Sequence, residues 1–350
     1  MAMSLTWDDV LVWRCRQQLL HRPAEAADPL VVVEALAGVQ AQVTSYAEQA
    51  VAVRQAEPDP ARVRDAIAQR RLVKTWAARG TLHLLEPAQA AAQLALIGAA
   101  RTWETASWQK TFVTLAQLER IAAAAYEALD NRVLTRDQLT EAIVGHSGDE
   151  TLREHLGSGW GAVLKPLAWQ GLLVYGPSDD ERRVTFTRPD TYVPGWRGLP
   201  EPAEAARVAI PAYLRAFGPA PAAAFDQWLL RGASKKAALR QWFADLLADG
   251  VIAEVDVEGE RLYARTADLE SLGAVEDFDE VRLLPAFDQF VLGPGTADTR
   301  VVPKEHRAQV SRAAGWISPV VAHRGRVVGV WDGDDVTIWS GDERIRAKIT

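Results

Sequence analysis

LAWQGLL at residues 167–173 and LADGVI at residues 247–252 are two copies of one local pattern. In each copy, an apolar-periodic stretch reaches a glycine, and further apolar residues follow that glycine directly. Glycine readily adopts the left-handed conformation that closes a helix, and a short apolar run after it favours a strand. The two copies therefore predict a repeated unit in which a helix leads into a strand.

The sequence around each copy extends the same prediction. Around the first copy we expect helices over residues 118–129 and 161–170, a helix between them with Thr135 as its N-cap, strands over 172–175 and 183–187, and a turn at 176–181. Around the second copy we expect helices over residues 206–217, 222–230 and 235–248, with strands over 251–255 and 261–264 that turn at Glu258 and Gly259. Both units therefore have the order helix, helix, helix, hairpin.

This order is typical of a winged-helix unit, in which one helix enters the major groove of DNA. Many such units only form scaffolds or bind other proteins, and that alternative stays open. A looser third copy is predicted nearer the N-terminus, with helices over residues 7–20, 29–37, 46–54 and 60–69, strands over 72–77 and 81–85 that turn at Arg79 and Gly80, and a further helix over 87–100.

The final part of the chain is rich in Val, Gly and Asp and predicts strands over residues 327–331 and 336–339. The expected fold class is α+β, with three tandem winged-helix units and a small β-rich C-terminal domain. We place the domains at residues 1–110, 111–198, 199–275 and 276–350.

The composition limits the possible functions. Of the 350 residues, 48% are hydrophobic, which is enough for well-filled cores. Cys15 is the only cysteine, so no internal disulfide is expected, and a reducing compartment is the simple interpretation. Asp8, Asp9 and Arg14 interrupt the N-terminal apolar stretch, which argues against a signal peptide. No uncharged apolar run approaches the ~20 residues of a membrane span.

The formal net charge of −7 argues against binding to nucleic acid, but the basic residues are clustered. One cluster contains Arg62, Arg64, Arg70, Arg71, Lys74 and Arg79, with Asp65 as the only nearby acid, and a second contains Arg231, Lys235, Lys236 and Arg240. Acidic residues gather elsewhere, at 276–280 and 332–335. One face of the molecule is therefore expected to be basic, although either cluster can also be an ordinary solvated helix face.

Gln40 and Gln42 lie in the segment GVQAQVTSY at residues 38–46. Gly38 is expected to end one helix, and Ser45 with Glu48 matches a capping box that would start the next. In an extended connection, residues two apart point the same way, so both amides can face one pocket. Without other information, a Gln-x-Gln pair is usually structural or exposed to solvent.

This segment resembles the catalytic motif of the AlkZ-type alkylpurine DNA glycosylases, a bacterial winged-helix family that includes toxin-resistance proteins. Three further segments resemble the same family in the same order, namely TWAARGTLHL at residues 75–84, LPAFDQFVLG at 284–293 and GRVVGVW at 325–331. One departure stands out. Residues 293–300, GPGTADTR, replace the Arg-rich hairpin tip that is usual in the family.

The resemblance implies a concave DNA-binding surface formed by three winged-helix units, with Gln40 and Gln42 as catalytic residues. It implies double-stranded DNA carrying alkylated purines as the partner, and it places this chain in the branch with glutamine at both motif positions. The predicted DNA contacts are Arg62, Arg70, Arg71, Lys74, Arg79, Thr81, His83, Arg300 and Arg324. A structural role is the alternative for Arg79 and His83. Asp288 is expected to have a structural role, fixing the loop that carries residues 298–300, and the alternative is that it supports the residues of the site.

The chemistry follows from the expected substrate. A purine alkylated at N7 or N3 is cationic, so its glycosidic bond is weakened and the departing base needs no protonation. A neutral glutamine can orient the attacking water through hydrogen bonds but is no strong general base, so positioning and electrostatics must supply the rate. Nothing in the sequence calls for a lysine Schiff base, so a monofunctional glycosylase is expected.

Other predictions concern partners and alternatives. The six histidines are scattered without metal-ligand spacing, and no glycine-rich cofactor motif is present, so we expect no metal and no cofactor. We expect a monomer in the bacterial cytosol or nucleoid that does not bind membranes. The alternatives are a non-catalytic winged-helix regulator and a self-resistance protein that sequesters a toxin adduct.

Overall fold

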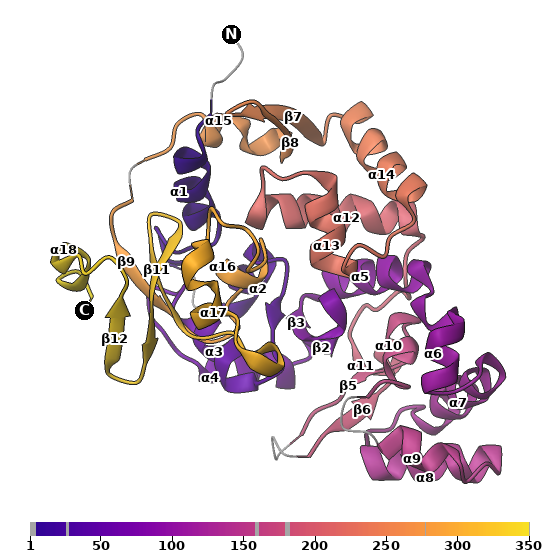
Figure 1. Cartoon of the computed structure of the whole chain (residues 1–350). Coiled ribbons are helices and arrows are strands. Elements are labelled where there is room, and N and C mark those ends of the chain that lie inside the picture. Colours follow the sequence, from indigo (N-terminus) through magenta and orange to yellow (C-terminus); the bar gives the residue numbers. More distant parts are fainter. Residues whose placement is uncertain (1–4, 26–27, 158–160, 179–182, 277, 350) are drawn as a thin grey trace.

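The computed structural model describes residues 5–25, 28–157, 161–178, 183–276 and 278–349. It combines many helices with small antiparallel sheets (Figure 1). Over these residues, no helix is both long enough and apolar enough to span a bilayer. The mixed α+β class expected from the sequence is therefore confirmed.

The first repeated segment contains the Gln-x-Gln motif. Its elements are α2 (Pro29–Ala35), β1 (Val39–Gln40), α3 (Thr44–Ala52), α4 (Ala61–Ala68), β2 (Val73–Trp76) and β3 (Leu82–Leu85). The strands pair in the order β1-β3-β2, so β1 adds to the hairpin that closes the segment. A long apolar helix, α5 (Pro87–Ala100), follows.

The second segment repeats this order. Its elements are α7 (Leu115–Ala128), β4 (Leu134–Thr135), α8 (Arg136–Ser147), α9 (Leu152–Gly157), α10 (Lys165–Trp169), β5 (Val174–Tyr175) and β6 (Thr185–Thr187). The strand order β4-β6-β5 matches that of the first sheet. Thr135 caps α8 as predicted, with Gln138 completing a capping box. The predicted turn at residues 176–181 lies partly outside the described residues.

The third segment contains α12 (Pro202–Phe217), α13 (Ala222–Leu230), α14 (Lys236–Ala248), β7 (Ile252–Val257) and β8 (Glu260–Arg265). A single bridge between Ala220 and Tyr263 stands where the other two segments have their first strand. The turn at Glu258 and Gly259 forms as predicted, and both residues have positive φ.

The two glycine-closed helices with which the sequence argument began end in the same way. Gly171 and Gly250 have φ of 72° and 68°. The next amide donates back across the helix end in each case, Leu172 to the Leu167 carbonyl and Val251 to the Leu246 carbonyl, both at 3.0 Å. The first of these helices is shorter than expected because it begins at Lys165 and not at residue 161.

α1 (Trp7–Gln17) packs away from the first segment, although the sequence placed it there. Trp7, Val10 and Trp13 pack with β7, β8 and α15 (Leu269–Leu272), while Leu11 and Cys15 pack with the C-terminal region. The Arg14 side chain donates to the carbonyls of Gly218 and Pro219, at 3.1 and 2.9 Å. The start of the chain thus joins the third segment to the C-terminal region.

The C-terminal region contains a four-stranded sheet in the order β12-β11-β10-β9. Its strands are β9 (Val281–Leu284), β10 (Val320–His323), β11 (Arg326–Asp332) and β12 (Asp335–Ile338), and its short helices are α16 (Gln289–Leu292), α17 (Arg307–Val310) and α18 (Glu343–Arg346). The predicted hairpin forms as β11 and β12, with Asp332 opposite Asp335.

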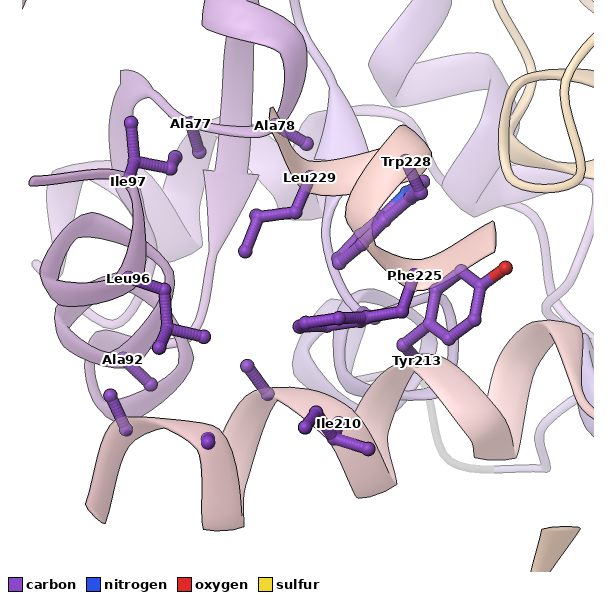
Figure 2. Packing of buried hydrophobic residues seen from close by; sticks show 14 of the residues in the cluster. Ala77, Ala78, Ala92, Leu96, Ile97, Ile210, Tyr213, Phe225, Trp228 and Leu229 are labelled. Carbon is purple, nitrogen blue, oxygen red and sulfur yellow. The ribbon is translucent and has the colours of Figure 1, made fainter. Parts of the chain in front are cut away.

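The core that positions the site lies between α5, α12 and α13. Ile97, Ile210, Phe225 and Trp228 meet there with the Ala77–Ala78 corner that follows β2 (Figure 2). Because that corner is buried by α13, the turn between β2 and β3 is held against the third segment. This turn carries Arg79, Gly80 and Thr81.

Candidate active site

The Gln-x-Gln segment is extended, as predicted. Gly38, with φ of 104°, ends α2, and its amide donates to the Val33 carbonyl at 2.9 Å. A Cβ at this position would lie 2.5 Å from Leu85 Cδ2, so glycine is needed for both conformation and space. Gln40 then pairs with His83 across β1 and β3, and the Ala41 amide donates to the Leu82 carbonyl at 2.7 Å.

The predicted capping box at Ser45 and Glu48 is wrong. α3 begins at Thr44, two residues earlier than predicted, and its N-cap Val43 offers no side-chain acceptor. Glu48 is buried and instead pairs with Arg64 on α4, with Glu48 Oε1 2.8 Å from Arg64 Nε. A long-range ion pair has replaced the local hydrogen bond that the sequence suggested.

Gln40 contacts the turn between β2 and β3, and Gln42 contacts the first residue of β3. Gln40 is buried, and its Oε1 lies 3.4 Å from both Arg79 Nη2 and Thr81 Oγ1. Gln42 is exposed, and its Oε1 accepts from the Leu82 amide at 3.5 Å. The two amides therefore both contact residues 79–82. The Gln40 amide is buried, and the Gln42 amide is open to solvent.

Arg79 occupies the centre of this arrangement in a left-handed conformation, with φ of 59°. Its Nη1 donates to the carbonyls of Trp228 and Leu292, at 3.1 and 3.4 Å. Burial, together with the nearby charge of Arg231, lowers the pKa of Arg79 to about 10, so the guanidinium stays charged at neutral pH. Arg79 thus connects Gln40 to α13 and α16.

A cavity of about 480 Å³ opens beside Gln42. All three repeated segments line it, with Gln42 and Thr81 from the first, Lys165 and Tyr175 from the second and Arg231 from the third. Its described lining residues include no Asp or Glu. The cavity therefore combines a neutral amide with a cationic wall.

Comparison with known proteins decides the family. The model of the AlkZ-like DNA glycosylase family matches residues 33–337. The chain belongs to the AlkZ-like DNA glycosylases. A relative from Streptomyces sahachiroi, named interstrand DNA cross-link repair glycosylase, is 45% identical over 99% of this chain and 94% of its own length. The solved structure of the Streptomyces sahachiroi DNA glycosylase AlkZ is similar, with a TM-score of 0.91 and 44% identity over 98% of this chain and 93% of that one.

The basic residues that were predicted to contact DNA in this AlkZ-like glycosylase differ from one another in the groups they contact within the protein. Arg62 lies 3.2 Å from Asp59, and Arg71 pairs with Asp28. The Arg70 guanidinium lies 4.8 Å from the centre of the Tyr192 ring. Lys74 donates to Thr44 Oγ1 at 3.0 Å, at the start of α3. None of these four side chains is among the residues that line the cavity beside Gln42.

The expected contact of His83 with DNA disagrees with its position. His83 is 1% exposed on β3, and its Nδ1 lies 3.0 Å from the Thr81 carbonyl. Burial lowers its pKa to about 3, with a further contribution from Arg79, so the ring is neutral. The structural alternative for His83 therefore fits better, since a neutral, buried imidazole offers no charge to a phosphate.

Arg300 and Arg324 also lie away from the cavity lining. Arg300 stacks over Trp7, 3.9 Å from the ring centre, and pairs with Glu260. Arg324 is exposed in the turn between β10 and β11, and the adjacent Gly325 packs on the backbone of Leu11. Neither residue belongs to the group that surrounds Gln42.

Asp288 has the structural role that the sequence left open. Asp288 and Arg54 are fully buried and form a two-point ion pair, with Nη1–Oδ2 and Nη2–Oδ1 distances of 2.8 and 2.7 Å. Asp288 also caps α16 through the Phe290 amide at 2.8 Å. This pair fastens the helix after the Gln-x-Gln segment to the C-terminal region.

Sequence reasoning missed Lys165, Tyr175 and Arg231 as cavity residues. Arg231 stood out only as one member of a basic cluster, and the sequence near Lys165 has no distinctive pattern. No pattern among neighbouring residues could have predicted that these three side chains share a cavity, because they come together only when separate segments pack against each other. Among the described residues, no cluster of His, Cys, Asp and Glu is suited to a metal ion.

Proposed function

We propose that this DNA glycosylase is monofunctional and removes N7- and N3-alkylated purines from double-stranded DNA. The observation that carries the proposal is that Gln40 contacts Arg79 in the turn after β2 while Gln42 contacts the nearby Leu82 and lines the cavity. The buried Gln40 would hold the geometry of the turn. The exposed Gln42 would orient the attacking water by donating and accepting hydrogen bonds.

The chemistry suits a leaving group that is already cationic. Since an alkylated purine leaves without protonation, the site needs no strong acid, and the described cavity lining contains no carboxylate to act as general base. Rate enhancement would then come from water positioning and from the electrostatic environment of the sugar as it gains positive charge. Neutral, undamaged purines would react far more slowly, which supplies selectivity.

We infer that the three repeated segments are winged-helix units that form one concave DNA-binding surface. Their shared element order and the matching strand orders of the first two sheets support this inference. The cavity lined by all three segments supports it too. Arg62, Arg70, Arg71, Lys74, Arg79 and Thr81 remain the proposed DNA-facing set, with Arg300 and Arg324 proposed as outer contacts.

The relative's name suggests a lesion class. We propose that interstrand cross-links and bulky purine adducts are accepted together with simple methyl adducts, because the cavity beside Gln42 offers about 480 Å³ of space. The glycosylase would act as a monomer in the bacterial cytosol or nucleoid. A non-catalytic regulator or a toxin-adduct binder remains the competing interpretation, and either would release no base.

Release of free 7-methylguanine from a methylated duplex tests the proposal. Wild type is expected to release the base, and Gln42→Ala to lose activity by about 10²–10³-fold, the usual loss when an oriented polar group is removed. Gln49→Ala is the matched control, because Gln49 is an exposed glutamine on α3. Equal rates for wild type and Gln42→Ala would refute the mechanism, and no release by wild type would refute the substrate.

A further inference from the structure

Two basic side chains on the wall of the cavity lack an acidic partner. Lys165, at the start of α10, and Arg231, directly after α13, form no ion pair with any carboxylate in the described part of the chain. Arg71, outside the cavity, is by contrast paired with Asp28. Two like charges in one cavity repel each other, so the arrangement costs free energy unless an anion neutralises it.

The positive charges of Lys165 and Arg231 are close enough for Arg231 to affect the pKa of Lys165. Burial lowers the pKa of Lys165 below its ordinary value, and the charge of Arg231 lowers it further. Arg231 also contributes to the lowered pKa of Arg79. Three cationic groups thus share one cavity with Gln42 and without a described acidic residue.

The local backbone fixes the positions from which both side chains extend. Arg231 has φ of 56°, and its amide donates to the Gln227 carbonyl at 3.2 Å, which closes α13. Lys165 precedes Pro166, and its amide donates to the Gly161 carbonyl at 3.0 Å. The following turn of α10 is anchored to the first segment by Trp169, whose Nε1 donates to the Trp76 carbonyl at 3.0 Å.

We propose that Lys165 and Arg231 form a phosphate clamp that holds the DNA backbone next to the lesion, one cation from the second segment and one from the third. Guanidinium and ammonium groups are the usual protein ligands of phosphate. The clamp would place the lesion's sugar against Gln42. The orientation of the DNA would then depend on the second and third segments, which carry no proposed catalytic residue. The inference rests on the proposed placement of DNA at Gln42.

Neutral polar variants test the clamp. Lys165→Gln and Arg231→Gln remove charge, and in the described part of the chain neither side chain makes a hydrogen bond or ion pair that would be lost. Binding is measured in a Gln42→Ala background, which prevents turnover, with a duplex carrying 7-methylguanine. Each variant is expected to weaken binding by roughly tenfold. Each should also flatten the slope of log K against log salt by about 0.9, and the double variant by about twice that.

Arg344→Gln is the matched control, because Arg344 is an exposed arginine on α18, far from β5 and α13 (Figure 1). It should change neither the affinity nor the slope. Arg231→Lys should restore most of the slope, since it restores the charge.

Two results would overturn the clamp. One is a Lys165→Gln, Arg231→Gln double variant that binds with the same slope as the Arg344 control. The other is borohydride trapping of a covalent DNA complex that disappears in Lys165→Gln, which would make Lys165 a nucleophile. Because binding is measured without base release, failure of the clamp and failure of the proposed substrate give different results.

Discussion

Arg79 Nη2 lies 3.4 Å from Gln40 Oε1, while Nη1 of the same guanidinium donates to the Trp228 and Leu292 carbonyls. These carbonyls belong to α13 and to the end of α16, so one side chain joins the Gln-x-Gln segment to two distant parts of the chain. The predicted role of Arg79 as a phosphate ligand thus competes with a positioning role, in which it fixes Gln40.

Arg79→Lys separates these two roles. Lysine keeps the charge but lacks the planar fork that reaches three acceptors. If Arg79 positions Gln40, kcat should fall by about tenfold with little change in KM for DNA. Steady-state kinetics of 7-methylguanine release measure both quantities, with Arg344→Lys as the control. A raised KM at constant kcat would instead make Arg79 a phosphate ligand.

Lys74 should contribute to DNA binding more than Arg71 does. Arg71 is paired with Asp28, whereas the Lys74 ammonium lies 5.8 Å from the centre of the Tyr175 ring, which lines the cavity beside Gln42. Lys74→Gln is therefore expected to flatten the salt dependence of binding by about 0.9 in log K per log salt, and Arg71→Gln by less. Filter binding or anisotropy across a salt series measures the slope. Unchanged slopes for both would remove this surface from the interface.

The pH dependence of stability should reveal the buried His83. The pKa of His83 is about 3 in the folded protein and about 6.5 in the unfolded chain, so the imidazole becomes protonated at a higher pH in the unfolded chain. The contribution of neutral His83 is full above the unfolded pKa and declines as the pH falls toward 3, by up to about 1.4 kcal/mol per pH unit.

Urea unfolding at pH 7, 6 and 5 measures this decline, and His83→Gln should make it shallower. Catalysis should behave differently. Because His83 stays neutral above pH 5, it should add no ionisation to the rate profile between pH 5 and 8. A wild-type decline no steeper than that of His83→Gln would show that His83 is solvated and protonated in the folded protein.

The Arg54–Asp288 pair should matter for folding. Arg54→Met leaves the Asp288 carboxylate buried without its partner, which is expected to cost about 3–5 kcal/mol of unfolding free energy. The Arg54→Met, Asp288→Leu double variant should recover part of that loss. Arg153→Met, which removes an exposed partner of Glu141, should cost less than about 1 kcal/mol. Urea titration gives all three values, and a loss of similar size at both sites would contradict the buried-charge argument.

Much of the fold was predictable from local patterns. The glycines that close the helices before β5 and β7, the Thr135 cap and the turn at Glu258 and Gly259 all formed as expected. The extended geometry of the Gln-x-Gln segment also formed. The start of α3 was not predictable, because Glu48 gained a better partner in Arg64 than the local capping box offered.

The sequence by itself determined the repeated order of helices and hairpins, the connection that carries Gln40 and Gln42, and the resemblance that led to the family. Those features depend on backbone preferences and apolar periodicity over a few neighbouring residues. Only the tertiary structure decided which charges share the cavity, which histidine is neutral and where Arg79 donates. Burial and electrostatic interactions depend on distances between segments far apart in the chain, and these distances exist only after Lys165 and Arg231 have been packed beside Gln42.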